Sequence, residues 1–250
     1  MMYDISGIFI ITLTFLVAGT VKGVIGLGLP TISLAILTVI FGLPEGMALL
    51  IVPSFLTNLW QALSGGYTSI ILRRLYIFLL AAACSVFLGA SIFMQVDPSS
   101  LSTFLGVLLM VYGLVNLANF SFLLNSRQVI VLAPLAGALN GIFTGMTGSM
   151  VVPGVMFLQA LGLHRDMLVQ AMGMLFTLST GVLALAMYEG SLLTLELGAM
   201  SSLGLVPALV GMALGQRIRK SLSEAVFRRV FFLSNLLIGA YIIVSNQLAY

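Results

Sequence analysis

Charged side chains are scarce in this 250-residue sequence, which has ten lysines and arginines and seven aspartates and glutamates. A soluble domain of this length would carry about 60 charged residues. With 60% hydrophobic residues and a mean hydropathy of +1.20, the chain has too little polar surface to cover a core in water. The composition therefore excludes a soluble globular protein and indicates a bilayer as the solvent. At roughly 20 residues per crossing, about eight to ten membrane segments fit.

Residues that build enzyme and metal sites are equally scarce. The single histidine, His164, and the single cysteine, Cys84, allow neither a metal cluster nor an intramolecular disulfide. All seven acidic residues fall in loops or at the ends of apolar blocks, so no reaction centre is visible within the membrane. The net charge of +3 comes without a basic stripe, which argues against nucleic acid binding. We expect no enzyme activity, no cofactor and no nucleic acid partner.

Apolar blocks make up most of the chain, and two of them are too long for one helix across about 30 Å of hydrocarbon. Each of these two is interrupted by glycines, which cost about 1 kcal/mol in a helix and so favour unwound backbone. We therefore predict two broken helices among the blocks. The blocks are 5–41, 46–63, 74–94, 101–124, 129–161, 167–188, 192–215 and 227–249; the interruptions are Gly23, Gly26 and Gly28 before Pro30, and Gly141, Gly145 and Gly148 before Pro153.

The two halves of the sequence are similar to each other. Residues 18–23 match residues 136–141, which places Lys22 opposite Asn140, and a second match links residues 41–44 with 161–164. We therefore predict one all-helical, polytopic transmembrane domain of two repeats. Each repeat consists of a broken helical hairpin plus three transmembrane helices; repeat one spans 1–124 and repeat two spans 125–250.

Loop charges predict opposite orientations for the two repeats, because Lys and Arg concentrate in cytoplasmic loops. Arg73 and Arg74 place the loop near 64–74 inside, and the basic residues of 217–229 place that loop inside. Stepping one crossing at a time puts both termini outside the cytoplasm and both ends of block 129–161 inside. This block then crosses as two short helices or forms a re-entrant hairpin. The result is an inverted repeat, common among secondary transporters, in a multi-pass protein of the plasma (bacterial inner) membrane.

The two glycine motifs, residues 23–30 and 141–153, are each followed by a second short motif, 41–44 and 161–163. This arrangement resembles the sulfite exporter family of the TauE/SafE type over nearly the whole chain. The resemblance implies an integral membrane transporter for small sulfur-containing or organic anions, such as sulfite, sulfonates and sulfoacetate. The sequence departs from the family's usual run of three glycines, because Leu27 and Leu29 flank Gly28 and because Thr147 interrupts the second copy.

A helix that starts after an unwound glycine segment presents free backbone N–H groups and the positive end of its dipole, which favour anions. Pro30 suits the first turn of a helix at 30–41, and Thr147 or Ser149 could cap a helix at 150–161. Two such helix starts could face one anion. Alternatively, the glycines only let helices pack closely.

Lys22 is the most informative single residue, since a lysine within an apolar block costs about 3 kcal/mol on insertion scales. Two interpretations are open: Lys22 binds the substrate anion together with Asn140, or its side chain snorkels to the cytoplasmic interface. Other polar residues in the blocks either complete the anion's hydrogen bonds or only join helices. The candidate substrate-binding residues are Lys22, Gly26, Gly28, Pro30, Asn58, Asn140, Thr144, Gly145, Thr147, Gly148, Ser149, Pro153, Gln170 and Thr177.

These observations predict a secondary transporter that moves a small anion across the bilayer by alternating access. A passive anion channel and a membrane partner subunit that does not itself transport remain alternatives. Because the acidic residues fall in loops or at block ends, a co-transported proton would travel on the substrate, or the process is uniport. The sequence leaves the oligomeric state open.

Overall fold

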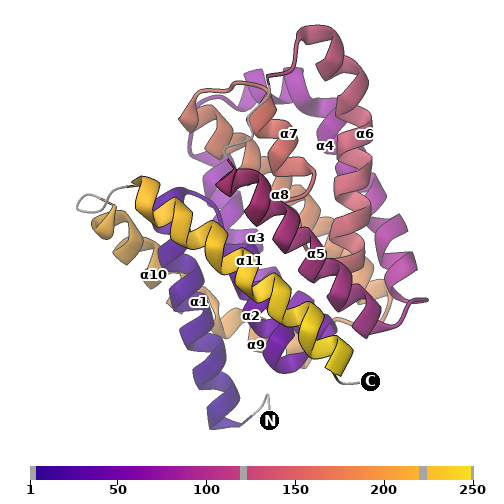
Figure 1. The fold of residues 1–250 in the computed structure, drawn as a ribbon, viewed down its shortest axis with the longest axis vertical. Helices are drawn as coiled ribbons and strands as arrows, with labels where there is room; N and C mark the ends of the chain where they lie inside the picture. The colour runs from indigo at the N-terminus through magenta and orange to yellow at the C-terminus, as the bar shows by residue number, and fades with distance from the viewer. Residues whose placement is uncertain (1–3, 119–122, 220–223, 249–250) are drawn as a thin grey trace. The chain divides into compact units, whose positions relative to one another are not determined.

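The computed structural model describes residues 4–118, 123–219 and 224–248, and the regular elements in these ranges are all helices (Figure 1). Eight spans are long and apolar enough to cross a membrane, counting α9 and α10 together, which confirms a multi-pass, all-helical protein. The helices are α1 (Ile5–Ile25), α2 (Leu29–Phe41), α3 (Leu43–Leu63), α4 (Thr68–Phe93), α5 (Pro98–Leu117), α6 (Ser126–Thr147), α7 (Gly154–Ala160), α8 (Arg165–Glu189), α9 (Leu195–Leu203), α10 (Leu205–Ile218) and α11 (Glu224–Leu248).

The chain divides into two compact units that each combine segments from both halves of the sequence. Unit 1 comprises Met1–Pro53, Asp97–Phe120 and Leu192–Tyr250, and unit 2 comprises Ser54–Val96 and Ser121–Ser191. Within unit 1, α1 packs against α10 and α5 against α11; within unit 2, α4 packs against α6 and α8. The closest partners of most helices are therefore distant in sequence.

Glycines allow α4 and α6 of unit 2 to approach closely. A Cβ atom at Gly137, Gly141 or Gly145 of α6 would collide with backbone carbonyl oxygens of α4. The three glycines are spaced four residues apart, so they share one face of α6. Small residues at this spacing are typical of helix contacts in membranes, where close van der Waals packing replaces the hydrophobic effect.

The same packing recurs in unit 1 between α1 and α10. Cβ atoms at Gly19 and Gly23 of α1, or at Gly211 and Gly215 of α10, would collide with the backbone of the facing helix. The expectation that the first glycines of each motif lie in unwound backbone is therefore wrong for Gly23 of α1. It is equally wrong for Gly141 and Gly145 of α6. These glycines serve the helix contact, and the backbone unwinds only after the contact ends.

Both long blocks are broken near their middle, at residues 26–28 and 148–153. The first contains the 21-residue α1 and the 13-residue α2. The second contains the 22-residue α6 and the seven-residue α7. The alternative of two short helices is wrong for block 129–161, because α6 alone is long enough to cross the membrane.

The start of α4 also differs from the expected block boundary. The helix begins at Thr68, so Arg73 and Arg74 lie within its second turn and not in a loop. Both arginines are exposed. Long basic side chains can keep their charge in water while their stems cover apolar surface, so a charge does not mark the end of a membrane helix.

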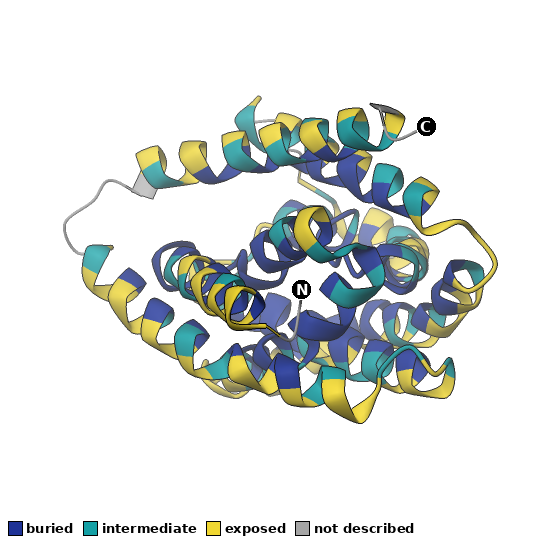
Figure 2. Cartoon of the chain, turned by 90° about the horizontal axis from the view of Figure 1, so that it is seen from below, coloured by how far each residue is buried: buried dark blue, intermediate teal, exposed yellow. Residues whose placement is uncertain are grey.

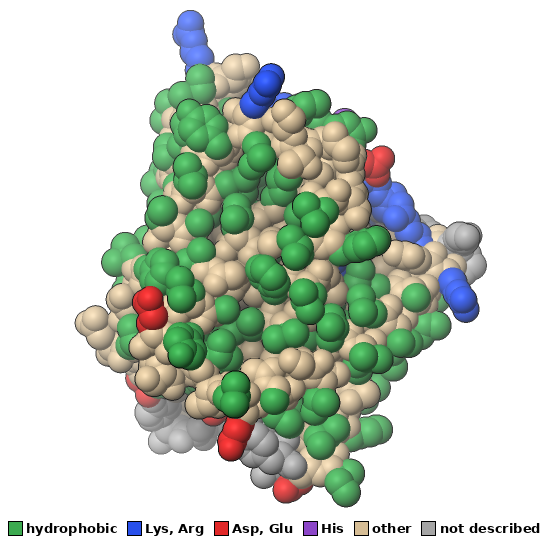
Figure 3. Space-filling view, turned by 180° about the vertical axis from the view of Figure 1, so that it is seen from behind, with side chains coloured by type: hydrophobic (Ala, Val, Ile, Leu, Met, Phe, Trp, Pro, Cys, Tyr) green, Lys and Arg blue, Asp and Glu red, His purple; other side chains and the backbone are tan. Residues whose placement is uncertain are grey.

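Many residues of each unit are exposed (Figure 2), and hydrophobic side chains are spread over the face of the molecule that Figure 3 shows. In unit 1, α11 exposes Val230, Leu237 and Val244, and in unit 2, α4 exposes Leu72 and Leu80. Apolar area on this scale is an aggregation hazard in water. In hydrocarbon it is the ordinary contact surface of a membrane protein.

We expect Gly141→Ala to destabilise the protein by about 1–3 kcal/mol, because the added methyl group meets the carbonyl of Ala82 in α4. The matched control is Gly198→Ala in α9, where a Cβ meets nothing within 4 Å. That control is expected to be neutral or slightly stabilising, since alanine favours helix. Thermal unfolding in detergent compares the two; equal midpoints would contradict the close α4–α6 contact.

Candidate functional site

The break between α1 and α2 is formed by Gly26, Leu27 and Gly28. Both glycines have left-handed backbone, with φ of 88° and 108°, a conformation that a residue with a side chain adopts only under strain. The N–H of Gly26 donates to the carbonyl of Lys22 at 2.7 Å, which closes the last turn of α1. Pro30 lies in the first turn of α2, as predicted, where its missing N–H costs no helix hydrogen bond.

The break between α6 and α7 begins in the same way. Gly148 is left-handed, with φ of 74°, and its N–H donates to the carbonyl of Thr144 at 2.7 Å. Thr144 therefore occupies in α6 the place that Lys22 occupies in α1. Counted from the helix end, Lys22 therefore corresponds to Thr144, one helical turn after Asn140, the residue with which the sequence comparison aligned it.

The predicted caps of the following helix are wrong. The helix α7 begins at Gly154 and not near residue 150, and no side chain of its N-cap residue, Pro153, bonds to it. The Thr147 hydroxyl instead donates to the carbonyl of Phe143 at 2.7 Å and accepts from the N–H of Ser149 at 3.2 Å. Thr147 thus bonds at the end of α6 and not at the start of α7. The segment between the two helices is longer than expected.

Asn140 of α6 supplies the missing partner for α7. Its Oδ1 accepts a hydrogen bond from the N–H of Gly154 at 3.0 Å. This bond fixes the orientation of the amide, because only the oxygen can accept. Asn140 is fully buried, and its Nδ2 has no hydrogen-bond partner among the described residues. One end of the amide is therefore structural and the other is available to a ligand.

Two further buried donors lie in unit 2 without partners in the described part of the chain. These are the hydroxyls of Ser149, in the break, and of Ser179, in α8; their residues are 3% and 0% exposed. Ser149 was a sequence candidate for substrate binding. Ser179 belongs, with Thr177 and Thr180, to the polar residues of its block that were expected either to complete the anion's hydrogen bonds or only to join helices.

Hydrogen bonds connect Asn140 to Ser149. The Thr144 hydroxyl donates to the carbonyl of Asn140 at 2.8 Å and to that of Ser149 at 3.1 Å. This one fully buried side chain ties the break to the last turns of α6. The two residues with free donors therefore belong to one hydrogen-bonded segment.

A second chain of contacts joins this segment to α8 and to the end of α3 that belongs to unit 2. The Thr180 hydroxyl donates to the Met150 sulfur at 3.6 Å and lies 3.4 Å from the Ser54 hydroxyl. The Ser54 hydroxyl in turn accepts a hydrogen bond from Asn58 Nδ2 at 3.0 Å. Ser149 and Ser179 directly precede the two residues of the first contact. We use the name polar cluster for Ser54, Asn58, Asn140, Thr144, Ser149 and Thr180 together with Ser179, which precedes Thr180 in α8.

Lys22 lies in unit 1, in the last turn of α1, and is 3% exposed. It is the one charged side chain among the buried residues of 4–118, 123–219 and 225–247, the ranges in which burial is described. Burial on this scale does not fit snorkelling, which keeps the ammonium group in water. Within the same ranges, no three His, Cys, Asp or Glu side chains come together in a way that could hold a metal ion.

Gln170 and Thr177 of α8 have other roles. The Gln170 amide accepts from the N–H of Tyr67 at 2.9 Å and donates to the Ala62 carbonyl at 2.8 Å and the Thr68 hydroxyl at 3.0 Å. It therefore latches the α3–α4 connection onto α8. Thr177 donates to the carbonyl of Gly173 at 2.7 Å within its own helix.

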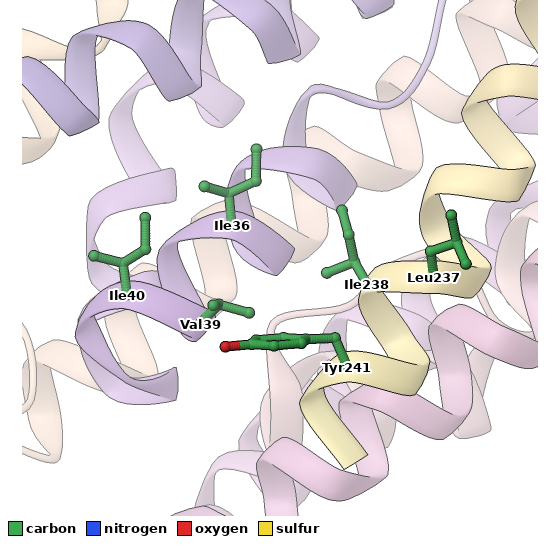
Figure 4. Close-up of a pocket in the computed structure, with 6 residues that line it drawn as sticks. All are labelled: Ile36, Val39, Ile40, Leu237, Ile238 and Tyr241. Atoms are coloured by element: carbon green, nitrogen blue, oxygen red, sulfur yellow. The ribbon is translucent and has the colours of Figure 1, made fainter. Parts of the chain in front are cut away.

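A pocket in unit 1 lies between α2 and α11 and is unsuited to an anion (Figure 4). Its lining is apolar apart from the hydroxyl of Tyr241. Because it offers no set of donors, the polar cluster is the better candidate for a binding site. The lining residues are Ile36, Val39, Ile40, Leu237, Ile238 and Tyr241.

Comparison with known proteins identifies one family. A family model described as sulfite exporter TauE/SafE matches residues 11–242, a range that includes both helix breaks, Lys22 and the whole polar cluster. No curated protein and no solved structure matches the chain.

We expect Gln170→Ala to lower stability by about 1–3 kcal/mol, because it leaves the N–H of Tyr67 and the carbonyl of Ala62 without their partner. The apparent affinity for substrate is expected to stay unchanged, since both the oxygen and the nitrogen of the Gln170 amide already bond to protein groups. The control is Gln247→Ala at an exposed position of α11. Thermal unfolding and flux measurements test this together; weaker substrate binding with unchanged stability would refute the latch.

Proposed function

Because the chain belongs to the TauE/SafE sulfite exporter family, whose members are membrane transporters and not enzymes, we propose that it moves a small anion by alternating access. The proposed substrate is sulfite, a sulfonate or a related organic acid. One observation carries the proposal beyond the family: three buried hydrogen-bond donors of the polar cluster have no partner in the described chain. We propose that a substrate that accepts hydrogen bonds supplies partners for these donors.

The chemistry of the cluster favours an anion over a cation or a neutral solute. Asn140 Nδ2 can only donate, and each serine hydroxyl can donate. A buried donor without a partner costs about 1–3 kcal/mol, a cost that a bound acceptor removes. The buried residues of 4–118, 123–219 and 225–247 include Lys22 and no acidic side chain, so these residues do not repel negative charge.

The proposed architecture is an inverted repeat with a site at the broken helices. Each half runs through a full-length helix, a shorter helix and three further spans. Left-handed glycines recur in both halves, Gly26 with Gly148 after the long helix and Gly42 with Gly162 after the short one. The loop charges support opposite orientations of the halves. Transporters of this kind alternate access around discontinuous helices.

The proposed binding residues follow from this arrangement. Lys22 supplies charge, and Asn140, Ser149 and Ser179 supply neutral donors. The glycines Gly26, Gly28 and Gly148 shape the breaks, with Pro30 and Pro153 at the helix starts. Asn58, Thr144 and Thr147 hold the surrounding hydrogen bonds. Gly145 serves helix packing instead.

A passive channel and a partner subunit without transport activity make different predictions. Purified protein in liposomes is offered sulfite, sulfonates and carboxylates, and initial rates are measured against concentration. Saturable flux supports the transporter. A linear, non-saturating rate would support the channel, and no flux with any anion would support the subunit.

We expect Lys22→Met to abolish saturable transport while the protein still inserts into the membrane, because the buried cation is lost. Arg74→Met, which removes an exposed cation from α4, serves as the matched control and should leave transport intact. Lys22→Arg keeps the charge and should retain part of the activity. Unchanged substrate affinity in Lys22→Met would contradict a role for this residue.

The proposed topology places both termini outside the cytoplasm. A reporter that is active only in the cytoplasm, fused after Tyr250, is expected to be silent, while the same reporter inserted after Ser64 is expected to be active. Tyr250 lies outside the described residues, so the test does not depend on its placement. A cytoplasmic signal from the fusion at Tyr250 would refute the inverted repeat.

A further inference from the structure

Arg73 lies on the face of α4 opposite the buried residues of this helix. It shares this face with Ile70, Tyr76, Ile77 and Leu80, because residues three, four and seven positions apart lie on one side of a helix. These four side chains are between 41% and 61% exposed, and Arg73 is exposed as well. In a membrane protein such a face contacts lipid, so the arginine has apolar or aromatic neighbours on both sides along a lipid-facing surface.

The depth of Arg73 follows from the register of α4 against α6. A Cβ atom at Gly137 of α6 would meet the carbonyl of Phe78 in α4, and the next contacts, one turn further along α6, lie one turn further along α4. The two helices therefore run parallel and in step, and Arg73 is level with residue 132, about 9 Å past the first residue of α6. At this level α6 already exposes apolar side chains, and Val131 is 71% exposed. Arg73 thus lies where the surface of unit 2 has become apolar.

The side chain of Arg73 has no partner in the described part of the chain. No hydrogen bond, ion pair or ring contact involves it there. Neither α4 nor the adjacent α6 contains an acidic residue. A charged side chain within the apolar part of a membrane helix is costly unless its charged group reaches a partner. The phosphate groups of the lipid headgroups are the anions that a lipid-facing arginine near a helix end meets.

We propose that Arg73 and Tyr76 bind the phosphate group of an anionic phospholipid, whose acyl chain lies along Ile77 and Leu80. The planar guanidinium group can donate two parallel hydrogen bonds to a phosphate, and the tyrosine hydroxyl can donate a third. A zwitterionic headgroup carries its own cation, so an anionic lipid gains more from the arginine. Free phosphate lacks the chain that contacts the apolar side chains. This site is independent of the proposed anion transport.

Native mass spectrometry measures lipid binding to the full chain, purified in detergent and offered phosphatidylglycerol or phosphatidylcholine with the same acyl chains. The unaltered protein is expected to bind phosphatidylglycerol about fivefold more tightly. Arg73→Gln should remove this preference. Tyr76→Phe loses only the hydroxyl and should reduce the preference by about twofold or more. Arg73→Lys keeps the charge without the planar fork and should retain part of the preference.

Arg74→Gln is the matched control, because it removes the same charge at nearly the same depth from another side of α4. Arg74 lies four residues before Phe78 and therefore on the side that faces α6. This variant should keep the preference, and thermal unfolding in lipid-free detergent checks that each variant is folded. No preference in the unaltered protein, or an equal loss in Arg73→Gln and Arg74→Gln, would overturn the site. Displacement of the lipid by glycerol 3-phosphate at the same concentration would also overturn it, because the acyl chain would then contribute nothing.

Discussion

The two helix breaks must satisfy their backbone groups without water, and this constraint shapes the structure around them. In unit 2, Asn140 and Thr144 of α6 bond to the start of α7 and to the break itself. A related solution occurs at Pro53 of α3, which has no N–H for the carbonyl of Leu49. The Ser201 hydroxyl donates to that carbonyl at 2.7 Å and accepts from the N–H of Val52 at 3.0 Å. These buried polar side chains thus supply hydrogen bonds that backbone groups of the interior would otherwise lack.

Two residues of the candidate site, Asn140 and Ser149, belong to one of these helix breaks or bond to it. An asparagine has one accepting and one donating end, so capping α7 with the oxygen of Asn140 leaves its nitrogen free. The unwound segment likewise brings Ser149 into the interior, where its hydroxyl finds no partner in the described chain. The helix break therefore leaves two buried hydrogen-bond donors without an acceptor in the described chain. A substrate that accepts hydrogen bonds is the proposed partner for these donors.

Composition and block lengths were enough to predict the membrane, the helical class and the two breaks, because these follow from apolar content and local backbone preference. The placement of Pro30 was also local. The bond between Asn140 and Gly154 was not predictable, since it depends on how α6 and α7 pack together. The glycines were misjudged for the same reason: Gly141 weakens an isolated helix, but against α4 it permits a close contact that a side chain would prevent.

The last turns of α1 and α6 differ in charge. Lys22 and Thr144 hold the same place, each accepting from a left-handed glycine, yet one carries a charge and the other does not. A lysine at position 144 would put a further positive charge into the interior, at a cost of several kcal/mol. Threonine instead uses its hydroxyl to bond the carbonyls of Asn140 and Ser149. The two helix ends thus share the backbone bond to a left-handed glycine, while α1 ends with a buried lysine and α6 with a threonine that ties the following break to its own helix.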